Sequence, residues 1–229
     1  MVIGGLQKLS LVDYPGKVCS VVFTQGCMFR CRFCHNPDLV LGRVKNTLSP
    51  ESVLDYVREH RNILDGVCVT GGEPTLHRDL EDFLRAIKEL GLLVKLDSNG
   101  INPARLAHFV EQELLDYIAM DLKAPWDKYK SIIQVSDEVS RQRCKKTMQV
   151  IQDSGVDHEF RTTVLPQVHI EEDFVVMAGY LRPGEKYFVQ NINYKTTLDE
   201  TLDSSAVLDV SGIVERLSRR YPKLEITER

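Results

Sequence analysis

The stretch GVCVTGGEPTLHRDLEDFLRAIKEL (residues 66–90) holds a short apolar run, a glycine turn and a helical pattern in succession. Residues 66–70 are apolar and end at two glycines, which is typical of a buried strand. Leu80, Phe83 and Ile87 then recur at the spacing of a helix with one apolar face. The stretch therefore predicts a strand, a tight turn and a helix.

The same succession recurs along the chain. Apolar runs predict strands at 18–23, 66–70, 92–96, 117–121, 158–164 and 186–190. Helical patterns follow at about 49–57, 80–90, 102–110, 137–154, 171–181 and 210–217. Strands that alternate with helices favour a parallel α/β sheet.

The number of units limits the architecture. A complete eight-unit barrel takes about 250 residues. Here six strand–helix units fill 229 residues, so we expect a single domain, residues 1–229, with an incomplete, open (β/α)6 barrel and a parallel sheet. We also expect residues 3–12 to pair with the first strand through a turn at 13–16.

Composition excludes several classes of protein. Apolar residues make up 43% and charged residues 27% of the chain, which disfavours intrinsic disorder. The apolar runs are far too short to span a membrane. A net charge of −4 gives no basic surplus that would indicate nucleic acid. The first residues lack the pattern of a signal peptide, so we expect a cytoplasmic protein with reduced thiols.

Three cysteines lie close together in the sequence. Cys27, Cys31 and Cys34 have the spacing C-x3-C-x2-C, and cysteine thiolates are the usual ligands of iron–sulfur clusters. A zinc site that adds His35 is an alternative, although adjacent ligands would strain a tetrahedral site. A c-type haem attachment and unliganded core thiols are two further alternatives. The other cysteines are expected to pack in the core, and they are Cys19, Cys68 and Cys144.

Polar residues follow the second and third predicted strands, where ligands bind in such folds. Gly71 and Gly72 would let the backbone approach a ligand, and Glu73 could accept hydrogen bonds from an ammonium group. The alternative is a simple turn, with Thr75 capping the next helix. Asp97 ends an apolar run, where a buried carboxylate needs a partner.

Charged residues continue this pattern at the later strands. Asp121 and Lys123 lie on one strand face, at positions i and i+2, and could form a structural salt bridge. Arg161 lies within a predicted strand, where an arginine is costly unless it is paired, and a plain ion pair would satisfy it. Polar groups that suit a substrate contact follow the sixth strand, and they are Gln190, Asn191 and Asn193.

The cysteine spacing, with Phe33 before the last cysteine, resembles the signature of the radical S-adenosylmethionine superfamily. The Gly71-Gly72-Glu73 segment resembles the Gly-Gly-Glu element of the same superfamily. The resemblance implies a [4Fe–4S] cluster on Cys27, Cys31 and Cys34. In this superfamily the open iron binds S-adenosylmethionine, and an electron from the cluster cleaves it to a 5′-deoxyadenosyl radical that abstracts hydrogen.

Two further segments resemble glycyl-radical-enzyme activating enzymes, which carry Asp-Thr-Asn-Gly and Asp-Leu-Lys at the positions of 97–100 and 121–123. Serine at position 98 is a small departure. Residues 5–17 resemble the longer subtype of the activating proteins of anaerobic ribonucleoside-triphosphate reductase. The late histidine of pyruvate formate-lyase activators has no clear match. The resemblance implies abstraction of a glycine hydrogen in a partner glycyl radical enzyme, most closely that reductase.

The resemblance also implies the roles of site residues, with no catalytic residue beyond the cluster and cofactor. Cofactor contacts are expected from Phe33, His35, Gly72, Glu73, Asp97, Ser98, Lys123 and Arg161. Asp97 and Asp121 would help to bind a monovalent cation beside the cofactor carboxylate. A flavodoxin or a ferredoxin-like protein would donate the electron.

Alternative functions remain open. The partner could be another glycyl radical enzyme, of the pyruvate formate-lyase type, or the substrate could be a small molecule or tRNA. The acidic balance disfavours tRNA. A non-enzymatic protein stabilised by an iron–sulfur cluster or zinc would explain the cysteines but not Gly71-Gly72-Glu73 with Asp97.

Overall fold

The strands of the sheet follow the order of the chain. In the computed structural model, which describes residues 1–135 and 138–229, eight strands lie in the order β1 to β8. β1 (Ile3–Ser10) runs antiparallel to β2 (Cys19–Thr24), as the predicted hairpin requires. The strand pairs β2–β3, β3–β4, β6–β7 and β7–β8 are parallel. The predicted α/β fold with an open, mainly parallel sheet is confirmed, because β1 and β8 end the strand order.

The chain comprises two compact units. Unit 1 consists of Met1–Met28, Asp38–Ala119 and Arg143–Asp157. Unit 2 consists of Phe29–Pro37, Met120–Gln142 and His158–Arg229. The sequence between Cys27 and Cys31 therefore passes from one unit to the other. The expectation of a single domain, residues 1–229, stays a prediction.

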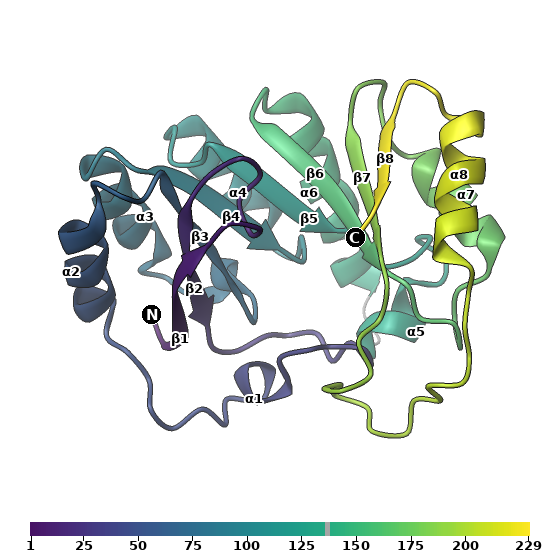
Figure 1. Cartoon of the computed structure of the whole chain (residues 1–229), viewed down its shortest axis with the longest axis horizontal. Helices are drawn as coiled ribbons and strands as arrows, with labels where there is room; N and C mark the ends of the chain where they lie inside the picture. The colour runs from purple at the N-terminus through teal and green to yellow at the C-terminus, as the bar shows by residue number, and fades with distance from the viewer. Residues whose placement is uncertain (136–137) are drawn as a thin grey trace. The chain divides into compact units, whose positions relative to one another are not determined.

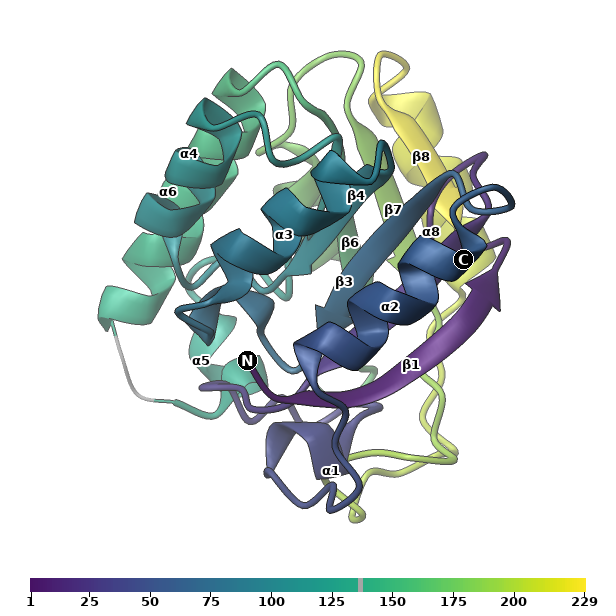
Figure 2. The same ribbon diagram turned by 90° about the vertical axis from the view of Figure 1, so that its left-hand side faces the viewer.

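Unit 1 contains the predicted strand, turn and helix of residues 66–90. β3 (Gly66–Gly71) and β4 (Leu93–Ser98) pair in parallel, and α3 (Leu80–Glu89) packs against β4. The predicted apolar stripe of α3 is buried. α2 (Pro50–His60) begins after Ser49, whose hydroxyl accepts a hydrogen bond from Ser52 N at 3.1 Å, and packs beside α3 (Figure 2).

The other elements of unit 1 are shorter or are shared with unit 2. They are α1 (Pro37–Val40), the 3₁₀ helix η1 (Pro74–Leu76), α4 (Pro103–Glu111), β5 (Tyr117–Asp121) and α6 (Glu138–Asp153). The predicted start of α6 at Asp137 lies outside the described residues. The six predicted strands are all present, with ends within two residues of those expected.

Unit 2 contains the last strands of the chain. Its elements are α5 (Tyr129–Ile133), β6 (Asp157–Thr163), α7 (Glu171–Ala178), β7 (Lys186–Gln190), α8 (Val210–Arg220) and β8 (Glu225–Glu228). α8 packs beside α7 and along β7 and β8 (Figure 1). β8 was not predicted, because Ile226 is the one apolar residue in its four-residue sequence. The strand forms by pairing with β7. No helix among the described residues has the length and hydropathy of a membrane span.

Candidate functional site

The glycine turn after β3 packs against the backbone that leads to Cys27. Gly72 N donates to Thr24 O at 2.8 Å, and Glu73 N donates to Gly26 O at 2.8 Å. A Cβ added at Gly72 would overlap with the carbonyl of Gly26. The glycine at position 72 is therefore required by the approach of two backbones, and this contact places the Gly-Gly-Glu segment beside the first cysteine.

The carboxylate of Glu73 is buried and accepts four hydrogen bonds within unit 1. Its exposed fraction is 0%, and it accepts hydrogen bonds from Thr75 N (3.1 Å), Thr75 Oγ1 (2.6 Å), Ser98 Oγ (2.9 Å) and Asn99 N (2.7 Å). Burial raises the pKa of Glu73, and these hydrogen bonds oppose the rise. Glu73, rather than Thr75, caps the short helix η1. A direct bond from Glu73 to a cofactor ammonium stays a prediction.

Asn99 connects this turn to the first cysteine. Its amide Nδ2 donates to Cys27 Sγ at 3.5 Å, and its Oδ1 accepts from Ile101 N at 3.0 Å. Glu73 holds the backbone of the same residue. Three sequence motifs thus meet within unit 1. No role was predicted for Asn99, although it belongs to the segment 97–100 that resembles glycyl-radical-enzyme activating enzymes.

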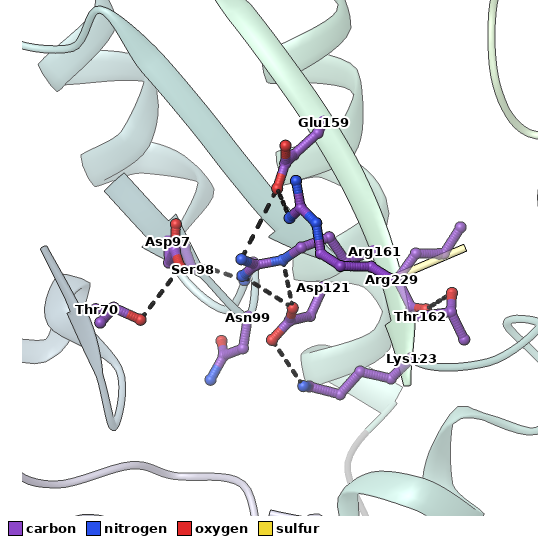
Figure 3. A network of polar contacts seen from close by, with 12 residues as sticks. Thr70, Asp97, Ser98, Asn99, Asp121, Lys123, Glu159, Arg161, Thr162 and Arg229 are labelled. Carbon is purple, nitrogen blue, oxygen red and sulfur yellow. Dashed lines mark hydrogen bonds and ion pairs between the residues drawn. The ribbon is translucent and has the colours of Figure 1, made fainter. Parts of the chain in front are cut away.

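Asp97 has a buried cationic partner. Its carboxylate forms an ion pair with Lys95, whose exposed fraction is 1%. It also accepts a hydrogen bond from Thr70 Oγ1 at 3.3 Å (Figure 3). Cys68 is buried, as expected, and its Sγ lies 3.8 Å from both Lys95 Nζ and Asp97 Oδ1. Lys95 is therefore the partner that Asp97 was predicted to need. Lys95 itself was predicted only as part of the strand at 92–96.

The cysteine loop, defined as residues Phe29–Pro37 of unit 2, carries the other two cysteines of the motif. Cys34 N donates to Cys31 O at 3.0 Å, which makes a tight turn between them. Burial raises the pKa of Cys31 to about 11, and it raises the pKa of Cys34 as well. Since a metal ligand must be a thiolate, metal binding has to offset this cost of ionisation.

Five charged side chains of alternating sign form a network in unit 2. Asp121 contacts Lys123 Nζ at 3.1 Å and the Arg161 guanidinium at 3.2 Å (Figure 3). Glu159 lies 3.9 Å from Arg161 and 3.0 Å from Arg229, and its exposed fraction is 0%. The ion pairs considered for Asp121, Lys123 and Arg161 are therefore present. Glu159 and Arg229 were not predicted as site residues, although Glu159 lies two residues before Arg161 on one strand face.

His169 fixes the backbone beside this network. It is 1% exposed, its Nδ1 accepts from Leu165 N at 2.9 Å, and its Nε2 lies 2.9 Å from Lys123 O. A carbonyl oxygen only accepts, so Nε2 carries the proton and the ring is neutral in this arrangement. Burial lowers the pKa of His169. Lys123 also lies with its Nζ 5.4 Å from the ring centre of Phe33 in the cysteine loop.

The cysteines have the chemistry of cluster ligands. All six cysteines are free thiols, and three of them have the spacing of the predicted cluster. Among residues 1–135 and 138–229, however, the structure brings no three His, Cys, Asp or Glu side chains together in a group that could hold a metal ion. The assignment of Cys27, Cys31 and Cys34 to one cluster therefore rests on their donor chemistry and spacing.

Comparison with known proteins decides the family. The family model of the Radical SAM superfamily matches residues 21–178, which is more than half of the chain. This chain belongs to the radical SAM superfamily. The matched residues include the cysteine motif and the Gly-Gly-Glu turn, and the superfamily implies S-adenosylmethionine and a [4Fe–4S] cluster as cofactors.

Relatives narrow the family further. A protein of Methanocaldococcus jannaschii, named as a candidate glycyl-radical enzyme activating enzyme, is 32% identical over 204 residues, which are 86% of this chain and 82% of the relative. The pyruvate formate-lyase-activating enzyme of Listeria monocytogenes is 35% identical over 128 residues, 52% of this chain and 51% of that enzyme. These homologues indicate an enzyme of the glycyl-radical-enzyme activating type.

Solved structures support the fold alone, because their sequences are distant. SuiB of Streptococcus suis bound to S-adenosylmethionine is 15% identical with a TM-score of 0.70, covering 91% of this chain and 49% of that chain. A radical SAM methyltransferase from Sphaerobacter thermophilus is 17% identical with a TM-score of 0.68, covering 96% of this chain and 68% of that chain. This chain thus spans about half the length of SuiB and of the Listeria enzyme.

Proposed function

We propose that this protein activates anaerobic ribonucleoside-triphosphate reductase by abstracting a hydrogen atom from a glycine of that enzyme. The observation that carries the proposal is the meeting of Cys27, Asn99 and Glu73 in unit 1, which brings the cysteine motif and the Gly-Gly-Glu turn together. The resemblance of residues 5–17 to the longer subtype of reductase activators supports this choice of partner.

We assign the following roles to the residues of the proposed cluster and cofactor site. Cys27, Cys31 and Cys34 would hold a [4Fe–4S] cluster, which together with S-adenosylmethionine supplies the radical that takes the hydrogen atom. Glu73 fixes the turn that meets Asn99. Lys123 and Arg161 bring positive charge that suits the carboxylate of the cofactor. Phe33, His35, Gly72, Asp97 and Ser98 are proposed as further cofactor contacts.

A monovalent cation at Asp97 and Asp121 is part of the proposal, and the structure defines its competitors. Asp97 already contacts Lys95, and Asp121 contacts Lys123 and Arg161. An added cation would have to share these carboxylates with protein cations. Its role is therefore tested by the dependence of activity on sodium or potassium.

A second candidate partner is a glycyl radical enzyme of the pyruvate formate-lyase type. The match to the Listeria monocytogenes activating enzyme over 52% of this chain favours it. The electron would come from a flavodoxin or a ferredoxin-like protein, and the protein would act in the cytoplasm.

The first test of the proposal needs no partner. The anaerobically reconstituted protein, reduced and mixed with S-adenosylmethionine, should release 5′-deoxyadenosine and methionine. Binding of zinc without iron–sulfur absorbance, and no cleavage, would contradict the proposal.

A further inference from the structure

The segment between β7 and α8, residues 191–209, contacts the cysteine loop at three points. Figure 1 shows this β7–α8 segment as the yellow-green loop before α8. Arg32 Nε donates to Asp199 Oδ2 at 2.7 Å, and Asp199 N donates to Arg32 O at 3.0 Å. His35 Nδ1 lies 3.3 Å from Thr196 O. All of these residues belong to unit 2.

Arg32 lies between two of the proposed cluster ligands. The cysteine loop has no helix or strand from Phe29 to Asn36, so its backbone is restricted by single contacts. Two of them are backbone hydrogen bonds, from Arg30 N to Ile133 O at 2.9 Å and from Cys34 N to Cys31 O at 3.0 Å. Asp199 holds both the side chain and the carbonyl of Arg32, in a closed pair of hydrogen bonds of which one is charge-assisted. This pair fixes the backbone at the residue that directly follows Cys31.

Asp199 is itself held in place. Its Oδ1 accepts from Thr201 N at 2.9 Å and from Thr201 Oγ1 at 2.6 Å, while its Oδ2 is left to Arg32. A turn of this kind orients the carboxylate before the ion pair forms. The side chains of Arg32 and Asp199 are 29% and 25% exposed, so solvent screens the pair only in part.

We propose that Asp199 is a positioning residue for the cysteine loop: acting through Arg32, it holds the backbone between Cys31 and Cys34 in the conformation that receives the cluster. The inference rests on the proposed function in so far as these cysteines are cluster ligands. Asp199 itself contacts neither cysteine through any described bond.

The same segment contains a matched control. Asp203 Oδ1 accepts from Ser205 N at 2.8 Å and from Ser205 Oγ at 2.6 Å, which repeats the turn at Asp199. Its carbonyl accepts from Gln167 Nε2 at 2.6 Å, so its described bonds lie outside the cysteine loop. Asp203→Asn thus removes an equal charge from an equal turn without touching Arg32.

The experiment compares hydrogen–deuterium exchange of the full-length chain without a cluster. In Asp199→Asn, peptides that cover Phe29–Pro37 should exchange about two- to fivefold faster, as expected from the loss of one partly screened ion pair. Asp203→Asn should leave these peptides unchanged. Exchange in β3 should be equal in both variants, which shows that the fold is kept.

A second measurement follows the reconstituted protein. Iron–sulfur absorbance should decay severalfold faster in air in Asp199→Asn than in Asp203→Asn. Arg32→Met should match Asp199→Asn, and the double variant should show no further acceleration of exchange, because both changes remove one interaction.

The outcomes separate the two claims. Equal exchange of the cysteine loop in Asp199→Asn and Asp203→Asn would overturn the positioning role. If neither the parent nor any variant binds a cluster, the proposed function is overturned. The exchange result would still decide whether Asp199 positions the cysteine loop. If Asp199→Asn does not fold, Arg32→Met supplies the same comparison.

Discussion

Glu73 Oε2 accepts a 2.7 Å hydrogen bond from the backbone of Asn99, and Asn99 in turn donates its amide to Cys27 Sγ at 3.5 Å. The buried carboxylate of Glu73 is thus linked to Cys27 by hydrogen bonds through one residue, Asn99. This arrangement gives Glu73 a structural task in the absence of any cofactor. It predicts that substitutions at Glu73 alter stability as well as cofactor binding.

Glu73→Gln should destabilise the protein without cofactor by about 1–3 kcal/mol, since the amide group of glutamine would face an N–H or O–H donor with its own N–H. Denaturant unfolding of the cofactor-free protein measures this. Glu59→Gln on the exposed side of α2 is the control and should be near neutral. Unchanged stability of Glu73→Gln would show that the four described hydrogen bonds do not form in solution.

Cys31→Ala should abolish the cluster, whereas Cys68→Ala should leave the iron content unchanged. The parent should bind about four irons per chain after anaerobic reconstitution, as a [4Fe–4S] cluster requires. Iron analysis and visible absorbance of the three proteins check this. Loss of iron in Cys68→Ala would mean that its position beside Lys95 and Asp97 matters for the cluster site.

Sodium and potassium should support different rates of cofactor cleavage if a monovalent cation binds at Asp97 and Asp121. Two carboxylates that share a cation lose that preference when one is neutralised, so Asp97→Asn should blunt the difference. The production of 5′-deoxyadenosine in matched salts is the measurement. The prediction would be contradicted if the parent enzyme cleaved the cofactor at the same rate in both salts. If Lys95→Met then gained a dependence on the salt, Lys95 would supply the positive charge beside Asp97 in place of a monovalent cation.

His169 should make the free energy of unfolding depend on pH below about 6.5, the ordinary pKa of histidine. The pKa of His169 is lowered in the folded protein, so the unfolded chain takes up the proton first as pH falls. Stability is therefore complete above that pH and declines as pH falls towards the folded pKa. Denaturant unfolding from pH 7 downward should show this slope in the parent.

His169→Gln should lose that part of the slope, because glutamine does not titrate. His108→Gln is the control, since His108 lies in the exposed part of α4 and pairs with Glu81. An identical pH profile in the parent and in His169→Gln would contradict the buried, neutral imidazole.

The fold followed from the sequence wherever an apolar run had to be buried. Residues 117–121 and 186–190 were predicted with their observed bounds. Four of the five residues of β5 are buried, which leaves an almost continuous apolar run in the sequence. β7 instead buries Tyr187 and Val189 in alternation with partly exposed residues, which is the pattern of a half-buried strand. β8 escaped prediction because its strand is polar and depends on hydrogen bonds to β7. Sequence patterns carry little information on pairing of that kind.

The candidate site was predictable in part for a similar reason. Motif residues such as Cys27, Glu73 and Asp97 stand at strand ends, where position in the sequence fixes position in the fold. Their partners Lys95 and Asn99 lie within two residues of Asp97 but carried no pattern of their own. The partners Arg229 and Asp199 are distant in sequence, and only folding brings them to Glu159 and Arg32.

The most direct test of the account is electron paramagnetic resonance of the reduced protein mixed with S-adenosylmethionine and the anaerobic ribonucleoside-triphosphate reductase of the same organism. A glycyl doublet is predicted, and replacing the partner glycine by alanine should remove it. Cofactor cleavage without a doublet would contradict the proposed partner. A doublet obtained only with an enzyme of the pyruvate formate-lyase type would transfer the activity to that partner.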